Sequence, residues 1–220
     1  MQKISVCVVD DHNLFRNAIV RLIKTFDRIG TVTDAGNGKD CLELFKKNTP
    51  DVVLLDLEMP VMNGVDTAEI LIAKYPKLKI IILTMHDSEN YILHLIEMGV
   101  HSFLLKNTNP KELELAISSV MSKDFYHNEL ISSVLRKSVV GRAKAERPVF
   151  VINKMVLLNE REKIIVKLIC INESNTKEIA DKLNLSERTI EGLRSDIFEK
   201  LQIKSTVGLV KFAYDSGMMS

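Results

Sequence analysis

The stretch Asp51-Val-Val-Leu-Leu-Asp56, followed at once by Leu57-Glu-Met-Pro-Val-Met-Asn-Gly64, decides the fold of this 220-residue chain. Apolar residues bounded by a turn with proline and glycine are typical of a buried parallel strand. Such a strand places Asp56 in the loop at its carboxyl end, where open α/β sheets have their binding and active sites. An aspartate that only opens a turn or caps a helix is the ordinary alternative, which the rest of the sequence must test.

Apolar runs of strand length alternate with helical patterns over residues 1–121. Such alternation predicts a parallel sheet covered by helices on both faces. Because crossovers between parallel strands are right-handed, a doubly wound α/β fold is the favoured topology. The predicted strands are residues 4–9, 30–33, 52–55, 80–83 and 102–105, and the predicted helices are residues 14–26, 39–47, 65–75, 90–98 and 110–121.

After residue 121 the pattern changes to helices alone. Residues 122–153 combine an amphipathic piece with a small, charged, proline-terminated stretch, which is typical of an exposed linker. In residues 154–220, Asn159, Ser186 and Ser205 stand where helix N-caps are expected. A short helix, a tight turn and a longer helix suit a helix-turn-helix, although any small helical bundle shows similar spacing.

Composition excludes several classes of protein. With 46% hydrophobic and 27% charged residues, the chain has the composition of a soluble globular protein. No apolar run approaches the ~18 residues that span a bilayer, and the N-terminus lacks the apolar core of a signal peptide. We therefore expect a cytoplasmic protein without membrane association. Cys7, Cys41 and Cys170 lie far apart among apolar residues, which favours buried thiols over zinc sites or disulfides.

The chemistry that Asp56 performs depends on its predicted neighbours. Asp10 and Asp11 follow the first strand, which adjoins the third in a doubly wound sheet, so these carboxylates converge with Asp56. Like charges in one cleft repel one another unless a cation is present, and such hard oxygen ligands suit Mg²⁺. Thr84 and Lys106 end the fourth and fifth strands, where a hydroxyl and an ammonium can meet phosphoryl oxygens. The set is sufficient for in-line phosphoryl transfer to Asp56.

This constellation, which covers residues 1–121 without a gap, resembles the (βα)5 flavodoxin-like receiver domain of two-component response regulators. The resemblance implies phosphorylation of Asp56 by a sensor histidine kinase or a small phosphodonor, with Mg²⁺ as the cofactor and no enzyme activity beyond the protein's own phosphorylation and dephosphorylation. It also implies particular roles: Asp11, Asp56 and the backbone carbonyl of Glu58 bind Mg²⁺, Asp10 acts through water, Lys106 and Thr84 contact the phosphoryl group, and Thr84 and Phe103 form a switch pair.

Residues 157–217 resemble the LuxR/NarL/FixJ-type DNA-binding domain, a four-helix unit, on motifs such as Leu185-Ser-Glu-Arg-Thr-Ile-Glu191. Leu193 stands where many members have histidine, and Glu191 repels phosphate, so we expect weak binding per monomer. The charge balance of residues 154–220, 11 Lys and Arg against 10 Asp and Glu, adds little support. Candidate phosphate contacts are Thr176, Lys177, Arg188, Thr189 and Arg194, and candidate base contacts are Glu191, Gly192 and Ser195.

The last predicted helix has a wide apolar surface that includes Val207, Val210 and Tyr214. By resemblance, this helix pairs two DNA-bound domains on an inverted repeat, so that two modest affinities combine in a homodimer. Packing of the same residues into their own domain is the alternative.

The whole chain therefore resembles a NarL/FixJ-type response regulator whose phosphorylation controls binding to promoter DNA and transcription. Two rival classes remain open at this point. One is a phosphorylation-dependent protein-interaction module whose helical domain does not read DNA. The other is a metal-dependent phosphotransferase, which would need a substrate pocket and a general acid that the sequence does not display.

Overall fold

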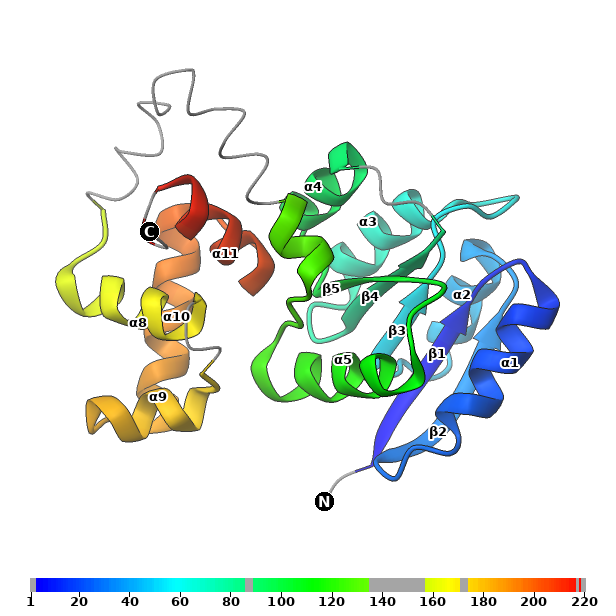
Figure 1. The fold of residues 1–220 in the computed structure, drawn as a ribbon, viewed down its shortest axis with the longest axis horizontal. Helices are drawn as coiled ribbons and strands as arrows, with labels where there is room; N and C mark the ends of the chain where they lie inside the picture. Colours follow the sequence, from blue (N-terminus) through cyan, green and yellow to red (C-terminus); the bar gives the residue numbers. More distant parts are fainter. Residues whose placement is uncertain (1–2, 86–88, 135–156, 171–173, 217, 219–220) are drawn as a thin grey trace. The chain divides into compact units, whose positions relative to one another are not determined.

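The computed structural model describes residues 3–85, 89–134, 157–170, 174–216 and 218, without the side chains of residues 89–91. The chain divides into two compact units, Met1–Tyr126 and His127–Ser220 (Figure 1). Within the predicted linker, residues 129–134 are helical, and residues 135–153 lie outside the described part of the chain.

A parallel sheet forms the centre of the first unit. Its strands are β1 (Ile4–Val9), β2 (Ile29–Ala35), β3 (Val52–Leu55), β4 (Lys79–Thr84) and β5 (Ser102–Leu105), in the spatial order β2-β1-β3-β4-β5. This order reverses the winding direction between β1 and β3, so the predicted doubly wound topology is confirmed. β2 is longer than predicted because Asp34 and Ala35 continue its pairing with Val8 and Val9.

Helices cover both faces of this sheet, as Figure 1 shows. They are α1 (Asn13–Ile23), α2 (Gly38–Phe45), α3 (Gly64–Lys74), α4 (Glu89–Met98) and α5 (Pro110–Lys123). Strand side chains alternate between the faces, so Val6 and Val8 join Ile23 of α1 and Leu113 of α5 in one core cluster. Cys7 points to the other face, where it is fully buried near Cys41 of α2. The expectation of buried thiols is confirmed, because Cys170 is buried as well.

Asparagine N-caps fix where three of these helices begin. The side chains of Asn37, Asn63 and Asn109 each accept a hydrogen bond from the backbone N–H of the residue three positions later. Each bond satisfies one of the N–H groups that a helix start leaves without a partner. The caps Asn37 and Asn109 follow the ends of strands β2 and β5 closely, so these two loops at the carboxyl edge of the sheet are short, whereas a longer loop separates β3 from Asn63.

The second unit contains α8 (Glu160–Cys170), α9 (Thr176–Leu183), α10 (Glu187–Leu201) and α11 (Thr206–Asp215). Asn184 adopts the left-handed conformation, with φ of 52°, and turns the chain sharply between α9 and α10. Buried Ile179, Ile190 and Ile197 join α9 and α10 to the core of the unit. The predicted short helix, tight turn and longer helix are therefore present. No helix in the described ranges is long and apolar enough to cross a membrane.

Candidate functional site

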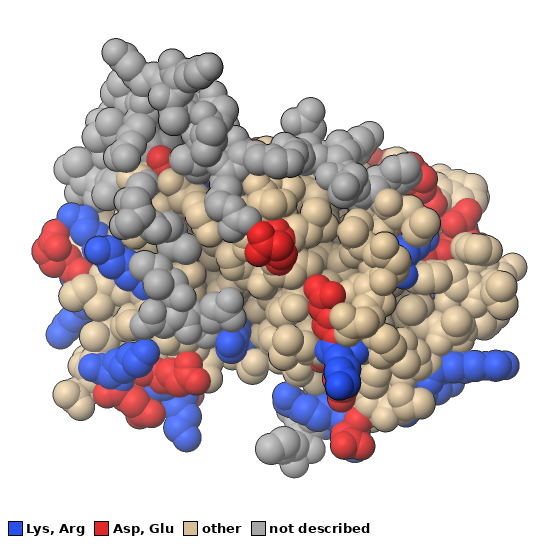
Figure 2. Space-filling model, viewed as in Figure 1, with Lys and Arg blue, Asp and Glu red and all other residues tan. Residues whose placement is uncertain are grey.

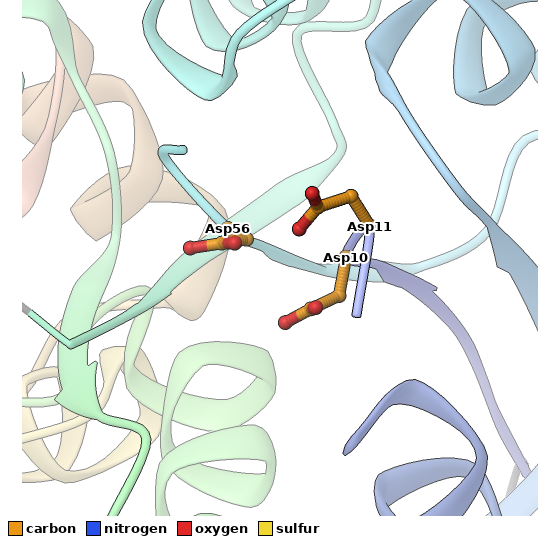
Figure 3. A group of neighbouring side chains, drawn as sticks. All are labelled: Asp10, Asp11 and Asp56. Carbon is orange, nitrogen blue, oxygen red and sulfur yellow. The ribbon is translucent and has the colours of Figure 1, made fainter. Parts of the chain in front are cut away.

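Acidic side chains converge at the carboxyl edge of the sheet, as predicted. The carboxylates of Asp10, Asp11 and Asp56 each offer an oxygen within 4.8 Å of the others (Figure 3). Asp10 donates its N–H to the carbonyl of Ala35, and Asp56 donates to that of Val9, at 3.2 and 2.9 Å. The sheet hydrogen bonds thus hold both residues just beyond their strands. Asp10 and Asp56 are 1% and 4% exposed, whereas Asp11 faces solvent.

Lys106 supplies the positive charge that these buried carboxylates require. Its Nζ lies 2.7 Å from Oδ2 of Asp56 and 2.8 Å from Oδ2 of Asp10. Burial raises the pKa of Asp56, and the hydrogen bond from Lys106 offsets this rise only in part. Burial alone would lower the pKa of Lys106, but its bonds to the two carboxylates outweigh burial and raise it. The Phe15 ring, 5.1 Å from Nζ, covers the ammonium from α1.

The chemistry of these donors fits a hard divalent cation. Oδ1 of Asp10 accepts a hydrogen bond from the His12 N–H at 2.8 Å. Oδ2 of Asp10 is buried without a hydrogen bond of normal geometry, although Lys106 is near enough for an ion pair. At 2.8 Å from Lys106 Nζ, this oxygen is one half of an ion pair. An oxygen with an unused lone pair beside two further carboxylates is suited to Mg²⁺.

The loop after Asp56 folds tightly back over that residue. The Gly64 N–H donates to the Leu57 carbonyl at 2.9 Å, and a Cβ on Gly64 would lie only 2.0 Å from the carbonyl oxygen of Asp56. At the loop tip Val61 has φ of 70°, which is unusual for a β-branched residue. The Glu58 side chain is exposed, and the use of its backbone carbonyl as a metal ligand stays a prediction.

The two residues of the predicted switch pair lie on neighbouring strands. Thr84 ends β4 and is 1% exposed, and Phe103 in β5 is fully buried and pairs with Ile82 of β4. The Lys106 N–H donates to the Thr84 carbonyl at 2.8 Å, so β4 and β5 stay paired up to the acidic site. Thr84 and Lys106 therefore lie at one edge with the carboxylates, while switching itself stays a prediction.

Most of the predicted DNA contacts are exposed on the second unit, and four of them share one face of α10. Arg188, Glu191, Gly192 and Ser195 of α10 are exposed, while Ile190 and Ile197 on the opposite side are buried. Lys177 and Thr189 are exposed and Thr176 is half-buried. On the face that Figure 2 draws, positive and negative side chains mix over the region of α9. This mixture agrees with the near-balanced charge of the sequence.

Arg194 differs from the free phosphate donor that the sequence suggested. It is half-buried, and its guanidinium donates to Oγ1 of Thr206 at 3.0 Å and to Oγ1 of Thr176 at 3.4 Å. The ring of Phe198 lies 5.9 Å away. Arg194 thus connects α10 to the first residues of α9 and α11. This geometry favours a role in holding the three helices together.

The predicted dimer residues are less accessible than their sequence pattern suggested. Val207 and Val210 are 2% and 1% exposed, and Tyr214 is half-buried. α11 contacts α8, and α8 contributes the buried residues Ile165 and Ile169. The burial of the two valines agrees with packing into their own unit, the alternative to chain pairing. A role in pairing two chains stays a prediction.

Sequence reasoning missed one residue beside the acidic cluster. Arg16 of α1 donates to the backbone carbonyl of Asp10, and its Nε lies 2.9 Å from Oδ2 of Asp34. An arginine in the first turns of a helix gives no sequence signal of its own. Only the sheet order, which brings the ends of β1 and β2 together, reveals its position.

Comparison with known proteins assigns both units. Residues 6–118 match the family model of the response regulator receiver domain, and residues 156–213 match that of bacterial regulatory proteins of the luxR family. Together with the parallel sheet and the acidic site, these matches define the class. The chain is a two-component response regulator with a receiver domain and a LuxR-type DNA-binding domain.

Within this class the chain belongs to the family of NarL/DegU/GacA-type response regulators, which are generally transcription factors rather than enzymes. It is 31% identical over 218 residues to the transcriptional regulatory protein MctR of Rhizobium johnstonii, covering 99% of this chain and 96% of that protein. It is 32% identical to the response regulator GacA of Pseudomonas aeruginosa, covering 98% of each. A solved RcsB–DNA complex shares the fold over 96% of this chain and 98% of that one, with a TM-score of 0.57 and 20% identity.

Proposed function

We propose that Mg²⁺-dependent phosphorylation of Asp56 by a sensor histidine kinase controls how this regulator binds DNA and alters transcription in the cytoplasm. The observation that carries the proposal is the convergence of Asp10, Asp11 and Asp56 within 4.8 Å, with Lys106 2.7 Å from Asp56. We assign the receiver to residues 1–121, the linker to 122–153 and the DNA-binding domain to 154–220.

In this proposal the receiver residues act by position and charge. Asp56 attacks the phosphorus of the donor in line: a bond forms between its carboxylate oxygen and phosphorus while the nitrogen–phosphorus bond of the kinase phosphohistidine breaks, and the imidazole leaves on the opposite side. The Lys106 ammonium, which contacts the Asp56 carboxylate before the reaction, then contacts the phosphoryl oxygens and stabilises the negative charge that develops on them. Bound Mg²⁺, held by Asp11, Asp56 and the Glu58 carbonyl with Asp10 acting through water, would neutralise the remaining negative charge. Thr84 then donates a hydrogen bond from its hydroxyl to a phosphoryl oxygen, and the Phe103 side chain changes its rotamer in response, which makes the two residues a switch pair.

The output in this proposal is a pair of DNA-binding domains on an inverted repeat. In this proposal the exposed face of α10 supplies Arg188, Glu191, Gly192 and Ser195 to the groove, and the exposed Lys177 and Thr189 contact phosphates. Phosphorylation acts by favouring the state in which two copies associate, with Val207, Val210 and Tyr214 of α11 as the predicted pairing residues. It can change DNA affinity only as far as the two states differ in stability.

Intact mass measurement tests the phosphorylation step. We expect the full chain, mixed with phosphoramidate or acetyl phosphate, to gain one phosphoryl group in Mg²⁺ and none in EDTA. Asp56→Asn should gain none, because an amide is not a nucleophile toward phosphorus. DNA fragments selected by the phosphorylated wild type should then bind it more tightly than they bind Asp56→Asn. Equal phosphorylation of Asp56→Asn would refute the assignment, and salt-independent, non-selective DNA binding would favour the protein-interaction alternative.

Gly192 offers a separate test of the DNA face. A Cβ at this position meets nothing within 4 Å, so the fold does not require glycine in the middle of α10. We expect Gly192→Ala to raise the free energy of unfolding of the DNA-binding domain by about 0.5–1 kcal/mol, because alanine is the better helix former. If this face meets DNA, the added methyl group should weaken binding to the selected fragment, as measured by fluorescence anisotropy. Unchanged affinity in the stabilised variant would place the DNA contact elsewhere.

A further inference from the structure

Arg16 joins three parts of the receiver at the edge of the acidic cluster. One guanidinium nitrogen donates to the backbone carbonyl of Asp10 at 2.5 Å, and the other donates to Oδ1 of Asn13 at 2.5 Å. Nε forms an ion pair with Asp34 at the end of β2, at 2.9 Å. The Arg16 side chain is only 13% exposed. The planar guanidinium group has several N–H donors in fixed directions, so it can bind these three partners at once, whereas a lysine ammonium cannot.

The hydrogen bond from Arg16 to the Asp10 carbonyl also affects the orientation of Asp11. The carbonyl that Arg16 holds belongs to the peptide bond that links Asp10 to Asp11. Because a peptide unit is planar, fixing its oxygen also fixes the direction in which the Asp11 backbone leaves β1. Asp11 is exposed, and its carboxylate faces the space between Asp10 and Asp56 (Figure 3). Without this hydrogen bond, the Asp10–Asp11 peptide can rotate and carry the Asp11 carboxylate away from Asp56.

We propose that Arg16 is a positioning residue for the divalent-cation site: it holds the Asp10–Asp11 peptide so that the Asp11 carboxylate stays directed at Asp56. The inference rests on the proposed Mg²⁺ site and extends it to a residue that touches neither the ion nor the phosphoryl group. Asp34 acts one step further out by holding the guanidinium, since its carboxylate binds Nε. Groups in such outer positions commonly tune metal affinity by orienting the ligands.

Whether Arg16 substitutions weaken or strengthen Mg²⁺ binding distinguishes a positioning role from a simple effect of the arginine charge. Arg16 is itself a cation near a cation site, so its charge disfavours Mg²⁺. If charge alone mattered, Arg16→Gln would bind Mg²⁺ more tightly and Arg16→Lys would bind as the wild type does. Positioning predicts weaker binding in both variants, because both lose the fork that holds the Asp10 carbonyl.

The test measures the Mg²⁺ dissociation constant by isothermal titration calorimetry on the full chain, without any phosphodonor. We expect the constant to rise about tenfold in Arg16→Gln and Arg16→Lys, and less in Asp34→Asn. The matched control is Arg21→Gln, the same change at an exposed arginine in the last turn of the same helix, which should leave the constant unchanged. The maximal phosphorylation rate at saturating Mg²⁺ should stay near that of the wild type in Arg16→Lys.

Two outcomes would overturn the inference while the proposed function stands. One is an unchanged Mg²⁺ constant in Arg16→Lys, with any loss confined to the melting temperature in EDTA, which would make Arg16 a purely structural residue. The other is tighter binding in Arg16→Gln. A wild type that binds no Mg²⁺ would instead refute the proposed function, and this inference with it. If Arg16→Gln fails to fold, the Mg²⁺ constants of Arg16→Lys and Asp34→Asn still test the inference, because each of these changes removes fewer of the Arg16 hydrogen bonds and ion pairs.

Discussion

Replacement of Lys106 by methionine is expected to lower the free energy of unfolding at neutral pH by about 3–5 kcal/mol in EDTA and to abolish phosphorylation of Asp56. Lys106 lies 2.8 Å from Asp10 and 2.7 Å from Asp56, and its side chain is only 10% exposed. Methionine has a similar length but no charge, so the variant leaves two buried carboxylates facing each other. Breaking a buried ion pair on one side in this way costs far more than removing both partners.

The pH dependence of that loss follows from the pKa of Asp56. Burial already raises this pKa above its ordinary value, and removal of the Lys106 hydrogen bond raises it further. In the window between the unfolded and folded pKa values, the native state then binds more protons than the unfolded state. Stability of the variant should therefore fall as the pH rises through this window and level off above it.

Urea unfolding of Lys106→Met over a pH series checks this expectation. Lys111→Met provides the control, because Lys111 is an exposed residue in the first turn of α5, the helix that follows Lys106 in the chain. The control should keep the wild-type pH profile. Parallel profiles for the two variants would show that the Lys106 ion pairs do not stabilise the acidic cluster.

Substitution of Gly64 by alanine is expected to destabilise the receiver by about 3 kcal/mol and to displace Asp56. The added Cβ would lie 2.0 Å from the Asp56 carbonyl oxygen and 2.7 Å from the Cα of Leu57. These atoms are backbone, so no side-chain rotation relieves the overlap. The loop must move instead, and with it the residue that accepts the phosphoryl group.

Gly192→Ala is the matched comparison for this prediction. The chemical change is the same, but the Gly192 position is open and the expected effect on stability has the opposite sign. Thermal unfolding of both variants, together with phosphorylation of Gly64→Ala by a small phosphodonor, gives the measurement. A Gly64→Ala variant with wild-type stability and phosphorylation would mean that the loop is far more adaptable than its contacts imply.

Local sequence patterns predicted most of the receiver correctly. The strands that are buried on both faces, such as Val52–Leu55, are short apolar runs that leave little ambiguity, and each receiver helix begins within one residue of its predicted start. The end of α1 was predicted at residue 26, whereas the helix ends at Ile23. There the Thr25 and Phe26 N–H groups donate to carbonyls three residues back, which tightens the last turn.

The acidic cluster could be assembled from sequence because each member follows a strand whose place in a doubly wound sheet is known. The roles of two arginines could not be predicted in this way. Arg16 and Arg194 both look like ordinary exposed helix residues, and each proves to be half-buried with partners on other elements. The apolar face of α11 posed a similar problem, because a periodic pattern does not distinguish a core face from a pairing face.

By itself, then, the sequence determined the order of strands and helices, the caps, and the types of side chain that end each strand, because these depend on neighbours along the chain. Tertiary structure decided which side chains are buried, and burial in turn shifts the pKa values of the ionisable groups. Burial raises the pKa of Asp56, and it lowers the pKa of His101 to about 4, where the ring accepts a hydrogen bond from the Ile80 N–H. Such shifts arise from desolvation and from partners distant in sequence, and no local pattern records either one.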